Sequence, residues 1–301
     1  MMKVAVLLST YNGEKFLQKQ LDSLLSQQDV ELTVLVRDDG STDQTISILE
    51  KYIKIHSNIR LIVGENIGVI HSFLTLVEMA GDGFDFYALC DQDDVWHENK
   101  LKAAIDLLEE KNNQQPLLYC SALEYVDADL NHRGHSSTRL HPSFGNALVE
   151  NIVTGCTAVF NPRLRELIIQ HRPHQAAMHD WWMYLLATAF GEVIFDPKCY
   201  IKYRQHGGNV VGAKPSFLPL WQRRLRIVLN REVILSIVQV AEFYQYYGDK
   251  LKGEKQILIH RFLQRKESLR ARWLLFSAVG IIKQTMLETV AVRLLIFLGW
   301  Y

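Results

Sequence analysis

The sequence lacks cysteine pairs, glycine-rich phosphate loops and long apolar runs. Its 301 residues contain four cysteines, none in a CxxC pair, at Cys90, Cys120, Cys156 and Cys199. This spacing excludes a zinc ribbon and a disulfide framework, so we expect free thiols in a reducing compartment. Neither GxxxxGKS/T nor GxGxxG occurs, so ATP hydrolysis and a dinucleotide site are not predicted.

The apolar runs of the sequence are too short for a leader or a membrane span. Residues 4–8 form a first run that ends at once in polar residues, so it is shorter than the apolar segment of a signal peptide. We predict a buried strand there and a cytoplasmic protein. The runs at 273–282 and 290–301 are bounded or interrupted by charge, and neither reaches the roughly 20 residues that span a bilayer.

Charge is balanced in total but not along the chain. The sequence has 33 Lys and Arg against 33 Asp and Glu, with 48% hydrophobic residues, which excludes a disordered chain, a collagen-like repeat and a multi-span membrane protein. Residues 1–213 hold 18 basic and 27 acidic residues, whereas residues 214–301 hold 15 and 6. We predict two regions with different roles, divided after residue 213.

The first 110 residues alternate between strand and helix patterns. Strands are predicted at 4–8, 32–36, 60–63 and 84–89, and helices at 14–27, 43–55, 69–80 and 97–111. This alternation predicts βαβ units and therefore a mainly parallel sheet with helices on both faces. Further strands are predicted at 117–120, 123–126, 153–160, 192–195 and 199–203, with helices at 163–171 and 180–190. We expect these strands to extend the same sheet in antiparallel fashion, and residues 214–301 to be helical.

A short polar cluster follows each of the first four predicted strands. The clusters are STYNG at 9–13, DDGS at 38–41, ENIG at 65–68 and DQDD at 91–94. The carboxyl ends of parallel strands lie at one edge of the sheet, where ligands bind. Each cluster alone could be a turn or a helix N-cap, but the four together predict a site at that edge.

The cluster at 91–94 places three carboxylates within four residues. Such charges repel each other unless a cation lies between them, and Mg2+ is bound by carboxylate and phosphate oxygens. The alternative is an acidic N-cap for the helix expected from residue 97, for which Asp94 would suffice. The pair Asp38 and Asp39 is either part of a turn or an acceptor for a nucleobase N–H or a ribose hydroxyl.

These clusters resemble the motifs of the family 2 glycosyltransferases, which are inverting enzymes with a GT-A fold. The resemblance rests on the four clusters in their order, and it continues through TGCT at 154–157, HDWW at 179–182 and YRQHGGN at 203–209. The motif DQDDVW at 91–96 is most similar to the corresponding motif of bacterial rhamnosyltransferases. The match covers residues 3–210. It implies an α/β GT-A catalytic domain at 1–213, with the helical region at 214–301 added to it.

The resemblance implies a role for each matching residue. A nucleotide pocket is implied for Thr10, Tyr11, Asn12, Asp39 and Asp91, with Asp39 on the base. Asp93 resembles the direct metal ligand of a DxD motif, and His206 resembles a histidine that reaches the metal or the diphosphate. The implied cofactor is Mg2+ or Mn2+. Asp180 matches the catalytic base, which takes the proton of the acceptor hydroxyl.

Contacts with the donor or acceptor sugar are implied for Asp94, Gly155, Trp181, Trp182 and Arg204. Simpler alternatives exist for several residues. Asp180 lies at the expected start of a helix and could be its N-cap, and His206 could be a turn residue before two glycines. Trp181 and Trp182 face different directions on a helix, so we expect one of the pair in the core.

The C-terminal region mixes basic and apolar residues at helical spacing, as in WQRRLRIV at 221–228. Basic amphipathic helices can lie on an anionic membrane surface, here the inner face of the cell membrane. The alternative is a helical bundle that packs on the catalytic domain or joins copies of the chain in a homo-oligomer. Nucleic-acid binding is not predicted, because the positive charge comes without a recognisable motif.

The sequence therefore predicts a metal-dependent inverting glycosyltransferase. The favoured donor is dTDP-rhamnose, with transfer of L-rhamnose to a growing surface polysaccharide (O-antigen, capsule or cell-wall glycan) or to its lipid-linked precursor. The first alternative is the same class of enzyme with another donor, such as a UDP-hexose. The second is a non-catalytic scaffold or binding subunit, which the presence of all the acidic site residues disfavours. The third is a nucleotidyltransferase, whose glycine-rich basic loop is not seen.

Overall fold

The computed structural model describes residues 1–206, 231–277 and 280–301. The basic segment predicted at 221–228 and the last residues of the motif at 203–209 lie outside this part of the chain. The chain divides into two compact units. The first contains residues 1–139, 153–172 and 191–212, and the second contains residues 140–152, 173–190 and 213–301. The division after residue 213 into a catalytic and a helical region stays a prediction.

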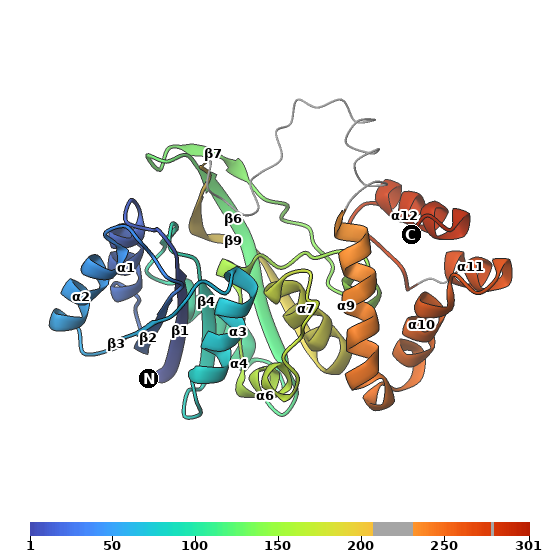
Figure 1. Ribbon diagram of the computed structural model, residues 1–301, viewed down its shortest axis with the longest axis horizontal. Coiled ribbons are helices and arrows are strands. Elements are labelled where there is room, and N and C mark those ends of the chain that lie inside the picture. Colours follow the sequence, from blue (N-terminus) through green and yellow to red (C-terminus); the bar gives the residue numbers. More distant parts are fainter. Residues whose placement is uncertain (207–230, 278–279) are drawn as a thin grey trace. The chain divides into compact units, whose positions relative to one another are not determined.

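Four parallel strands and the helices between them open the first unit (Figure 1). The strands are β1 (Met2–Thr10), β2 (Val30–Asp38), β3 (Ile59–Val63) and β4 (Phe86–Cys90). The helices are α1 (Leu17–Leu25), α2 (Thr45–Ile55), α3 (Val69–Met79) and α4 (Lys100–Glu109). The strand order is β3-β2-β1-β4, and every pair is parallel, as the alternating pattern predicted. Successive residues of β1 from Val4 to Leu8 are all buried, so both faces of this strand are covered.

The sheet continues through strands from the second half of the chain. They are β5 (Val95–Trp96), β6 (Leu117–Val126), β7 (His132–His135), β8 (Val159–Phe160) and β9 (Glu192–Arg204), and α6 (Pro162–Gln170) follows β8. Beyond β4 the order is β8-β6-β9-β5, and β7 pairs with β6. The short strand β8 runs antiparallel to both β4 and β6, whereas β6 and β9 are parallel. The expected extension is therefore only partly antiparallel.

Five of the strands predicted in the second half of the sheet differ in extent from the structure. The segments at 117–120 and 123–126 form one strand, β6, and those at 192–195 and 199–203 form one strand, β9. The register between these two strands shifts where Pro197 lies, because proline cannot donate to the ladder. The strand predicted at 153–160 is interrupted by the 3-10 turn η1 (Gly155–Thr157), and only its last two residues form β8.

The second unit is helical in its described part. It contains α5 (Phe144–Ala147), α7 (His179–Phe190), α9 (Arg231–Tyr247), the 3-10 turn η2 (Gly248–Lys250), α10 (Gly253–Gln264), α11 (Leu269–Phe276) and α12 (Met286–Leu298). Every residue of α7 from His179 to Ala189 is buried, as expected for a helix that is apolar on most sides. Within the described residues, none of the helices has the length and apolar character needed to cross a membrane.

Candidate functional site

The carboxyl ends of the four parallel strands meet at one edge of the first unit. Thr10 at the end of β1 pairs with Asp38 at the end of β2, and Asp38 pairs in turn with Val63 of β3. On the other side of β1, Leu8 pairs with Cys90, the last residue of β4. The four polar loops predicted from the sequence therefore start side by side.

Hydrogen bonds join the first loop to the fourth. The amide N–H of Tyr11 donates to Oε1 of Gln92 over 2.9 Å, and Nε2 of Gln92 donates back to the carbonyl of Tyr11 over 3.0 Å. A Cβ atom at Gly13 would lie 2.2 Å from Oε1 of Gln92, so this reciprocal pair requires a glycine there. The ring of Tyr11 is 47% exposed and is free to meet a ligand.

The first loop is also joined to the second. Thr10 donates to Oδ2 of Asp38 over 2.9 Å, and the amide of Thr42 donates to the side chain of Asn12 over 2.9 Å. The amide of Asn12 donates to Oγ of Ser41. Thr10 is buried and Asn12 is exposed. The hydroxyl of Thr10 is thus engaged in loop structure, whereas Asn12 remains accessible from solvent.

Asp39 joins the second loop to the third. Its carboxylate accepts hydrogen bonds from the amides of Ile67 over 3.0 Å and Gly68 over 2.9 Å, and it forms a buried ion pair with Arg37. Asp39 is 3% exposed. A nucleobase contact by this carboxylate, as predicted, must therefore be shared with three existing partners.

The acidic fourth loop meets the end of β9. Oδ2 of Asp93 lies 2.7 Å from Nε2 of His206, two residues beyond the strand. The ring of His206 also lies against Phe16, with centroids 4.8 Å apart. The structure therefore brings together the two residues that the resemblance paired as metal ligands.

Arg204, the last residue of β9, forms hydrogen bonds with two residues of the acidic loop. It is fully buried, its Nε donates to the carbonyl of Asp93 over 2.7 Å, and its amide donates to Oδ1 of Asp94 over 3.1 Å. Its guanidinium also donates to the carbonyl of Ala128 and lies 4.4 Å above the ring of Phe16. These contacts give Arg204 a supporting role in place of the sugar contact that the sequence suggested.

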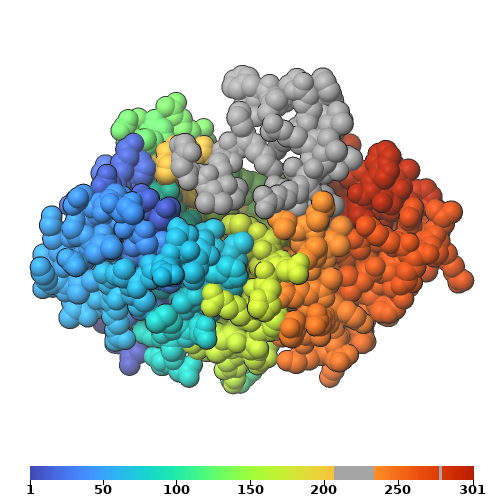
Figure 2. Space-filling model, viewed as in Figure 1, coloured from blue at the N-terminus to red at the C-terminus, as the bar shows by residue number. Residues whose placement is uncertain are grey.

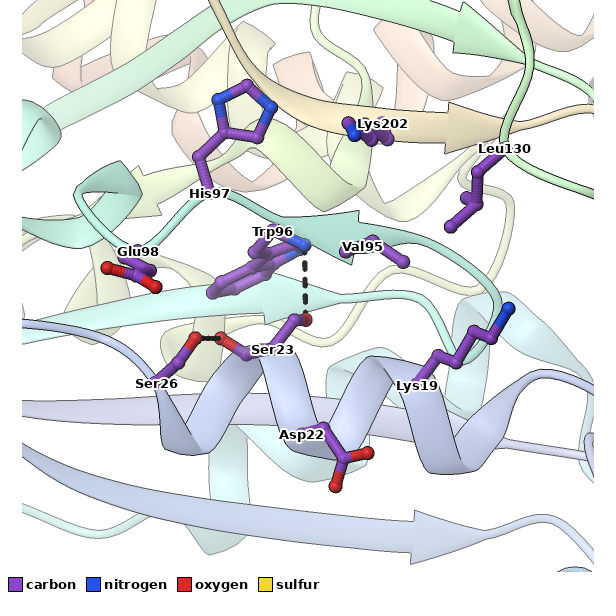
Figure 3. Close-up of a pocket in the computed structure, with 10 residues that line it drawn as sticks. All are labelled: Lys19, Asp22, Ser23, Ser26, Val95, Trp96, His97, Glu98, Leu130 and Lys202. Carbon is purple, nitrogen blue, oxygen red and sulfur yellow. Dashed lines mark hydrogen bonds between the residues drawn. The ribbon is translucent and has the colours of Figure 1, made fainter.

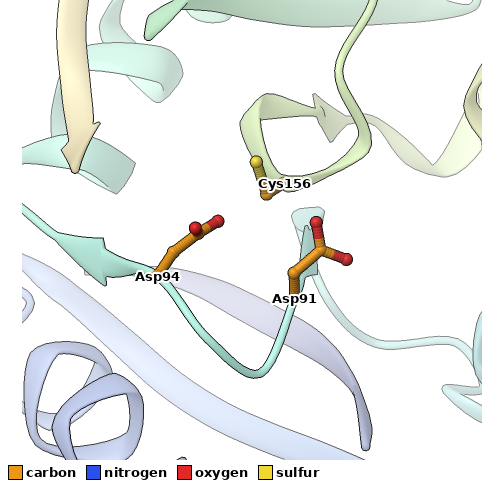
Figure 4. A group of neighbouring side chains, drawn as sticks. All are labelled: Asp91, Asp94 and Cys156. Carbon is orange, nitrogen blue, oxygen red and sulfur yellow. The ribbon is translucent and has the colours of Figure 1, made fainter. Parts of the chain in front are cut away.

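A second group in this loop comprises Asp91, Asp94 and Cys156, whose ligand atoms all lie within 4.8 Å of one another (Figure 4). Asp94 and Cys156 are fully buried, and Asp91 is partly exposed. Burial, followed by the charges of Asp93 and Asp91, raises the pKa of Asp94 well above its usual value. Burial likewise raises the pKa of the Cys156 thiol. Burial thus favours the protonated forms of Asp94 and Cys156, and a nearby positive charge favours the ionised form of Asp94.

A buried lysine lies behind this group. Lys100 is fully enclosed, and its Nζ lies 3.3 Å from the centroid of the Trp96 ring. Nζ makes no hydrogen bond within the described residues, and burial lowers the pKa of Lys100 to about 8. The carboxylate of Asp94 favours the charged form of this lysine. Lys100 is thus a buried positive charge beneath an acidic loop.

The Asp93–His206 pair fits a divalent cation. Oδ2 of Asp93 and Nε2 of His206 share a hydrogen bond of 2.7 Å, and both atoms are of types that would ligate a divalent cation in place of that bond. A carboxylate oxygen suits Mg2+ and Mn2+, and an imidazole favours transition metals. Asp91, two residues before Asp93, offers a further carboxylate on the same loop. The donor set thus suits Mn2+ better than Mg2+.

The residues of the first unit that were predicted to contact the donor or acceptor sugar are buried. Asp94 and Arg204 have no exposed surface, and Gly155 is enclosed at the start of η1. Asp94 is not an N-cap either, because β5 follows it and α4 begins only at Lys100, with Asn99 as its N-cap. We therefore assign these residues to the support of the loop and not to direct contact with a sugar.

The remaining predicted residues lie in the second unit, on α7. Asp180 is in the first turn of the helix, is 6% exposed, and accepts a hydrogen bond from Nδ2 of Asn151 over 2.9 Å. Trp181 donates through Nε1 to the carbonyl of Ala147, and Trp182 packs edge-on against Phe243. Trp181 is 7% exposed and Trp182 is fully buried. Both tryptophans are thus core residues, whereas the sequence predicted one.

A shallow cleft of about 440 Å³ opens elsewhere on the first unit (Figure 3). It lies between α1 and β5, and its described lining includes Lys19, Asp22, Trp96, Glu98 and Lys202. None of the predicted site residues is among its described lining residues. The lining carries both basic and acidic side chains, so it does not favour a ligand of one charge. Figure 3 shows the hydrogen bond from the amide of Trp96 to Oγ of Ser23 on α1. This cleft is therefore not part of the candidate site at the strand ends.

Sequence reasoning missed four residues that support the site, namely Phe16, Arg37, Gln92 and Lys100. Two of them carried a usable signal. Arg37 interrupts an apolar strand just before an acidic pair, and Lys100 opens the apolar face of α4. A basic residue at a position expected to be buried requires a partner, and the nearby acidic clusters were the obvious ones.

Comparison with known proteins agrees with this geometry. Residues 5–172 match the family model described as Glycosyl transferase family 2. The chain is 30% identical over 248 residues to the dTDP-rhamnosyl transferase RfbG of Shigella flexneri, covering 78% of this chain and 83% of that protein. It is 26% identical over 214 residues to the putative teichuronic acid biosynthesis glycosyltransferase TuaG of Bacillus subtilis, covering 70% and 82%.

Solved structures show the same fold. TarS 1–349 of S. aureus, in complex with UDP-GlcNAc, superposes with a TM-score of 0.58 at 19% identity, over 99% of this chain and 91% of that one. The mannosyltransferase PcManGT from Pyrobaculum calidifontis, in complex with GDP-Man and Mn2+, gives 0.52 at 16% identity, over 98% and 86%. The predicted GT-A fold is confirmed.

Proposed function

The chain belongs to glycosyl transferase family 2, and from this premise we propose that it is a metal-dependent inverting rhamnosyltransferase. The donor is dTDP-rhamnose, and the acceptor is a surface glycan or its lipid-linked precursor. The observation that carries the donor assignment is the 30% identity to a dTDP-rhamnosyl transferase over most of both chains.

The nucleotide binds at the loops that follow β1 and β2. Tyr11 offers an exposed ring for contact with the base or ribose, and Asn12 is accessible beside it. Asp39 accepts a hydrogen bond from the base, and its buried pairing with Arg37 fixes the orientation of the carboxylate. Thr10 acts through the loop that it anchors to Asp38. Asp91 contacts the ribose or the water shell of the cation.

Asp93 and His206 would hold the divalent cation, and the hydrogen bond of 2.7 Å that now joins them shows that both side chains reach the same point. A bound cation neutralises the negative charge that develops on the leaving diphosphate. Arg204 fixes the backbone of Asp93, so the carboxylate is held in place before the donor arrives. Of the two predicted ions, we propose Mn2+, because the donor set includes an imidazole.

Asp180 is the base. The bond between the anomeric carbon and the diphosphate oxygen breaks, a new bond forms to the acceptor oxygen, and the acceptor proton passes to the carboxylate of Asp180. Proton transfer of this kind contributes roughly 10²–10⁴-fold to a rate. Asn151, which donates to Oδ1 of Asp180, orients the carboxylate for this step.

Nucleotide binding provides the first test. Titration calorimetry of the full chain with dTDP, UDP and GDP, each with Mn2+ and with EDTA, should give the tightest binding for dTDP with Mn2+. Tyr11→Ala should weaken that binding, whereas Tyr246→Ala, an exposed tyrosine on α9, should not. Tighter binding of UDP would favour a UDP-hexose donor. Failure to bind any of the three nucleotides would favour a scaffold subunit and contradict the proposal.

A further inference from the structure

The last helix of the chain leaves an apolar stripe uncovered. Leu287, Val290, Leu294 and Leu298 of α12 are 61%, 45%, 46% and 51% exposed, respectively. Their spacing of three, four and four residues places them on one face of the helix. We call these four residues the outer stripe.

The opposite face of α12 is already packed. Val292 and Ile296 are almost completely buried, and Leu295 is 8% exposed. The helix is therefore apolar both on the side that faces the protein and on the side that faces solvent. Soluble monomers seldom leave such a stripe uncovered, so the outer stripe marks an interaction surface.

The neighbouring helix α11 enlarges this surface. Trp273 is 56% exposed, and its ring lies against Phe276 and Phe297 with centroids 5.6 and 6.1 Å apart. Phe297 belongs to α12, so the aromatic contact joins the two helices. Figure 1 shows them next to each other, and both contribute red surface in Figure 2. Trp300, just beyond α12, is 63% exposed.

The charges around these helices are mainly positive. Residues 266–301 contain five basic and two acidic side chains. Lys266 and Arg270 are exposed at the start of α11, while Lys283 is 3.6 Å from Glu150 and Arg293 donates to the carbonyl of Ile281. The apolar surface thus has a basic rim.

We propose that the outer stripe, with Trp273, docks on the surface of an anionic lipid bilayer. Apolar side chains enter the acyl boundary, tryptophans favour the headgroup level, and the basic rim attracts anionic lipids. The 13 residues of α12 span about 20 Å, which is shorter than the roughly 30 Å hydrocarbon core of a bilayer. The helix therefore lies in the plane of the interface. A second copy is the poorer occupant, because a symmetric contact would bring two positively charged surfaces together.

Vesicle flotation of the full chain tests the proposal without any sugar donor. At low salt the protein should float with vesicles of phosphatidylcholine containing about one third phosphatidylglycerol, and bind pure phosphatidylcholine at least about tenfold more weakly. The triple variant Leu287→Gln, Leu294→Gln and Leu298→Gln should lose at least about tenfold in binding. Ile257→Gln on α10, a residue that is 53% exposed, is the matched control and should float like the wild type.

A second measurement covers the case in which the triple variant misfolds. Brominated phosphatidylglycerol should quench the tryptophan fluorescence of the wild-type protein, and the double variant Trp273→Phe, Trp300→Phe should lose most of that quenching. Absence of both flotation and quenching at low salt overturns the proposal. So does a concentration-dependent dimer, measured by light scattering, that the triple variant converts to monomers while neither protein binds vesicles.

Discussion

Nε2 of His206 lies 2.7 Å from Oδ2 of Asp93, although 113 residues separate the two in the sequence. The contact links the end of β9 to the loop after β4. It depends on Arg204, which fixes the backbone of Asp93.

The first prediction concerns this pair. His206→Asn should raise the Mn2+ concentration needed for half-maximal activity by on the order of 10–100-fold, the range found even for residues that act indirectly on a metal. A metal titration of initial rates measures the effect. His260→Asn, an exposed histidine on α10, is the control. An unchanged Mn2+ dependence in the His206 variant would show that this side chain does not hold the ion.

The second prediction concerns the buried lysine. Lys100→Met should lower the free energy of unfolding by about 1–3 kcal/mol, because Asp94 then lacks a buried positive charge. Combining it with Asp94→Asn should recover part of that loss, since the two charges interact.

Denaturant unfolding measures the Lys100 effect. The matched control is Lys102→Met on the same helix, where the side chain is 43% exposed and pairs with Asp106. An exposed pair of this kind contributes little, so the control should change stability by less than about 0.5 kcal/mol. Equal losses for Lys100→Met and Lys102→Met would refute the role of burial.

The third prediction concerns Asp180. Asp180→Asn should lower kcat by roughly 10²–10⁴-fold while nucleotide affinity stays within about twofold, because only proton transfer is removed. Asp196→Asn replaces another buried carboxylate, one bonded to the amide of Lys198, and should keep near-normal activity. Transfer at the normal rate by the Asp180 variant would show that this carboxylate is not the base.

The fourth prediction concerns pH. Burial lowers the pKa of His179 to about 3 from an ordinary value of 6.5. Because the folded pKa is depressed, the neutral side chain is compatible with folding above pH 6.5, and stability falls as pH drops from 6.5 toward 3. This one group should contribute a loss of roughly 2 kcal/mol between pH 7.5 and pH 5.

Comparison with His179→Gln isolates the histidine from the carboxylates that also titrate. Unfolding free energies of both proteins at pH 7.5 and pH 5 give the difference. The variant should lose about 2 kcal/mol less than the wild type over this range. If both proteins lost the same amount, the pKa of His179 would be close to its ordinary value.

Local patterns predicted the parallel half of the sheet well. The run from Val4 to Leu8 is apolar on both faces, and such strands occur where helices cover both sides. The convergence of the four loops followed from topology alone, because parallel strands end at one edge. These predictions needed no knowledge of side-chain contacts.

Long-range pairings could not be predicted in the same way. The side chain of Arg204 donates to the backbone of Asp93, a residue 111 positions earlier in the chain. A local sequence pattern cannot predict such a contact, because it depends on where β9 lies relative to the acidic loop. The burial of Asp94 has the same origin, since a carboxylate after an apolar strand is ordinarily exposed. The two strands predicted at 192–195 and 199–203 are one strand, β9, because the pairing with β6 continues across Pro197 with only a register shift.

The most direct test of the account is nucleoside diphosphate release by the purified full chain, measured with dTDP-rhamnose and with a set of UDP-hexoses in the presence of an acceptor extract. With Mn2+ the account predicts release from dTDP-rhamnose at least about tenfold faster than from any UDP-hexose, and its loss when EDTA is added. Release from UDP-hexoses only, or release from dTDP-rhamnose at an equal rate in EDTA, would contradict it.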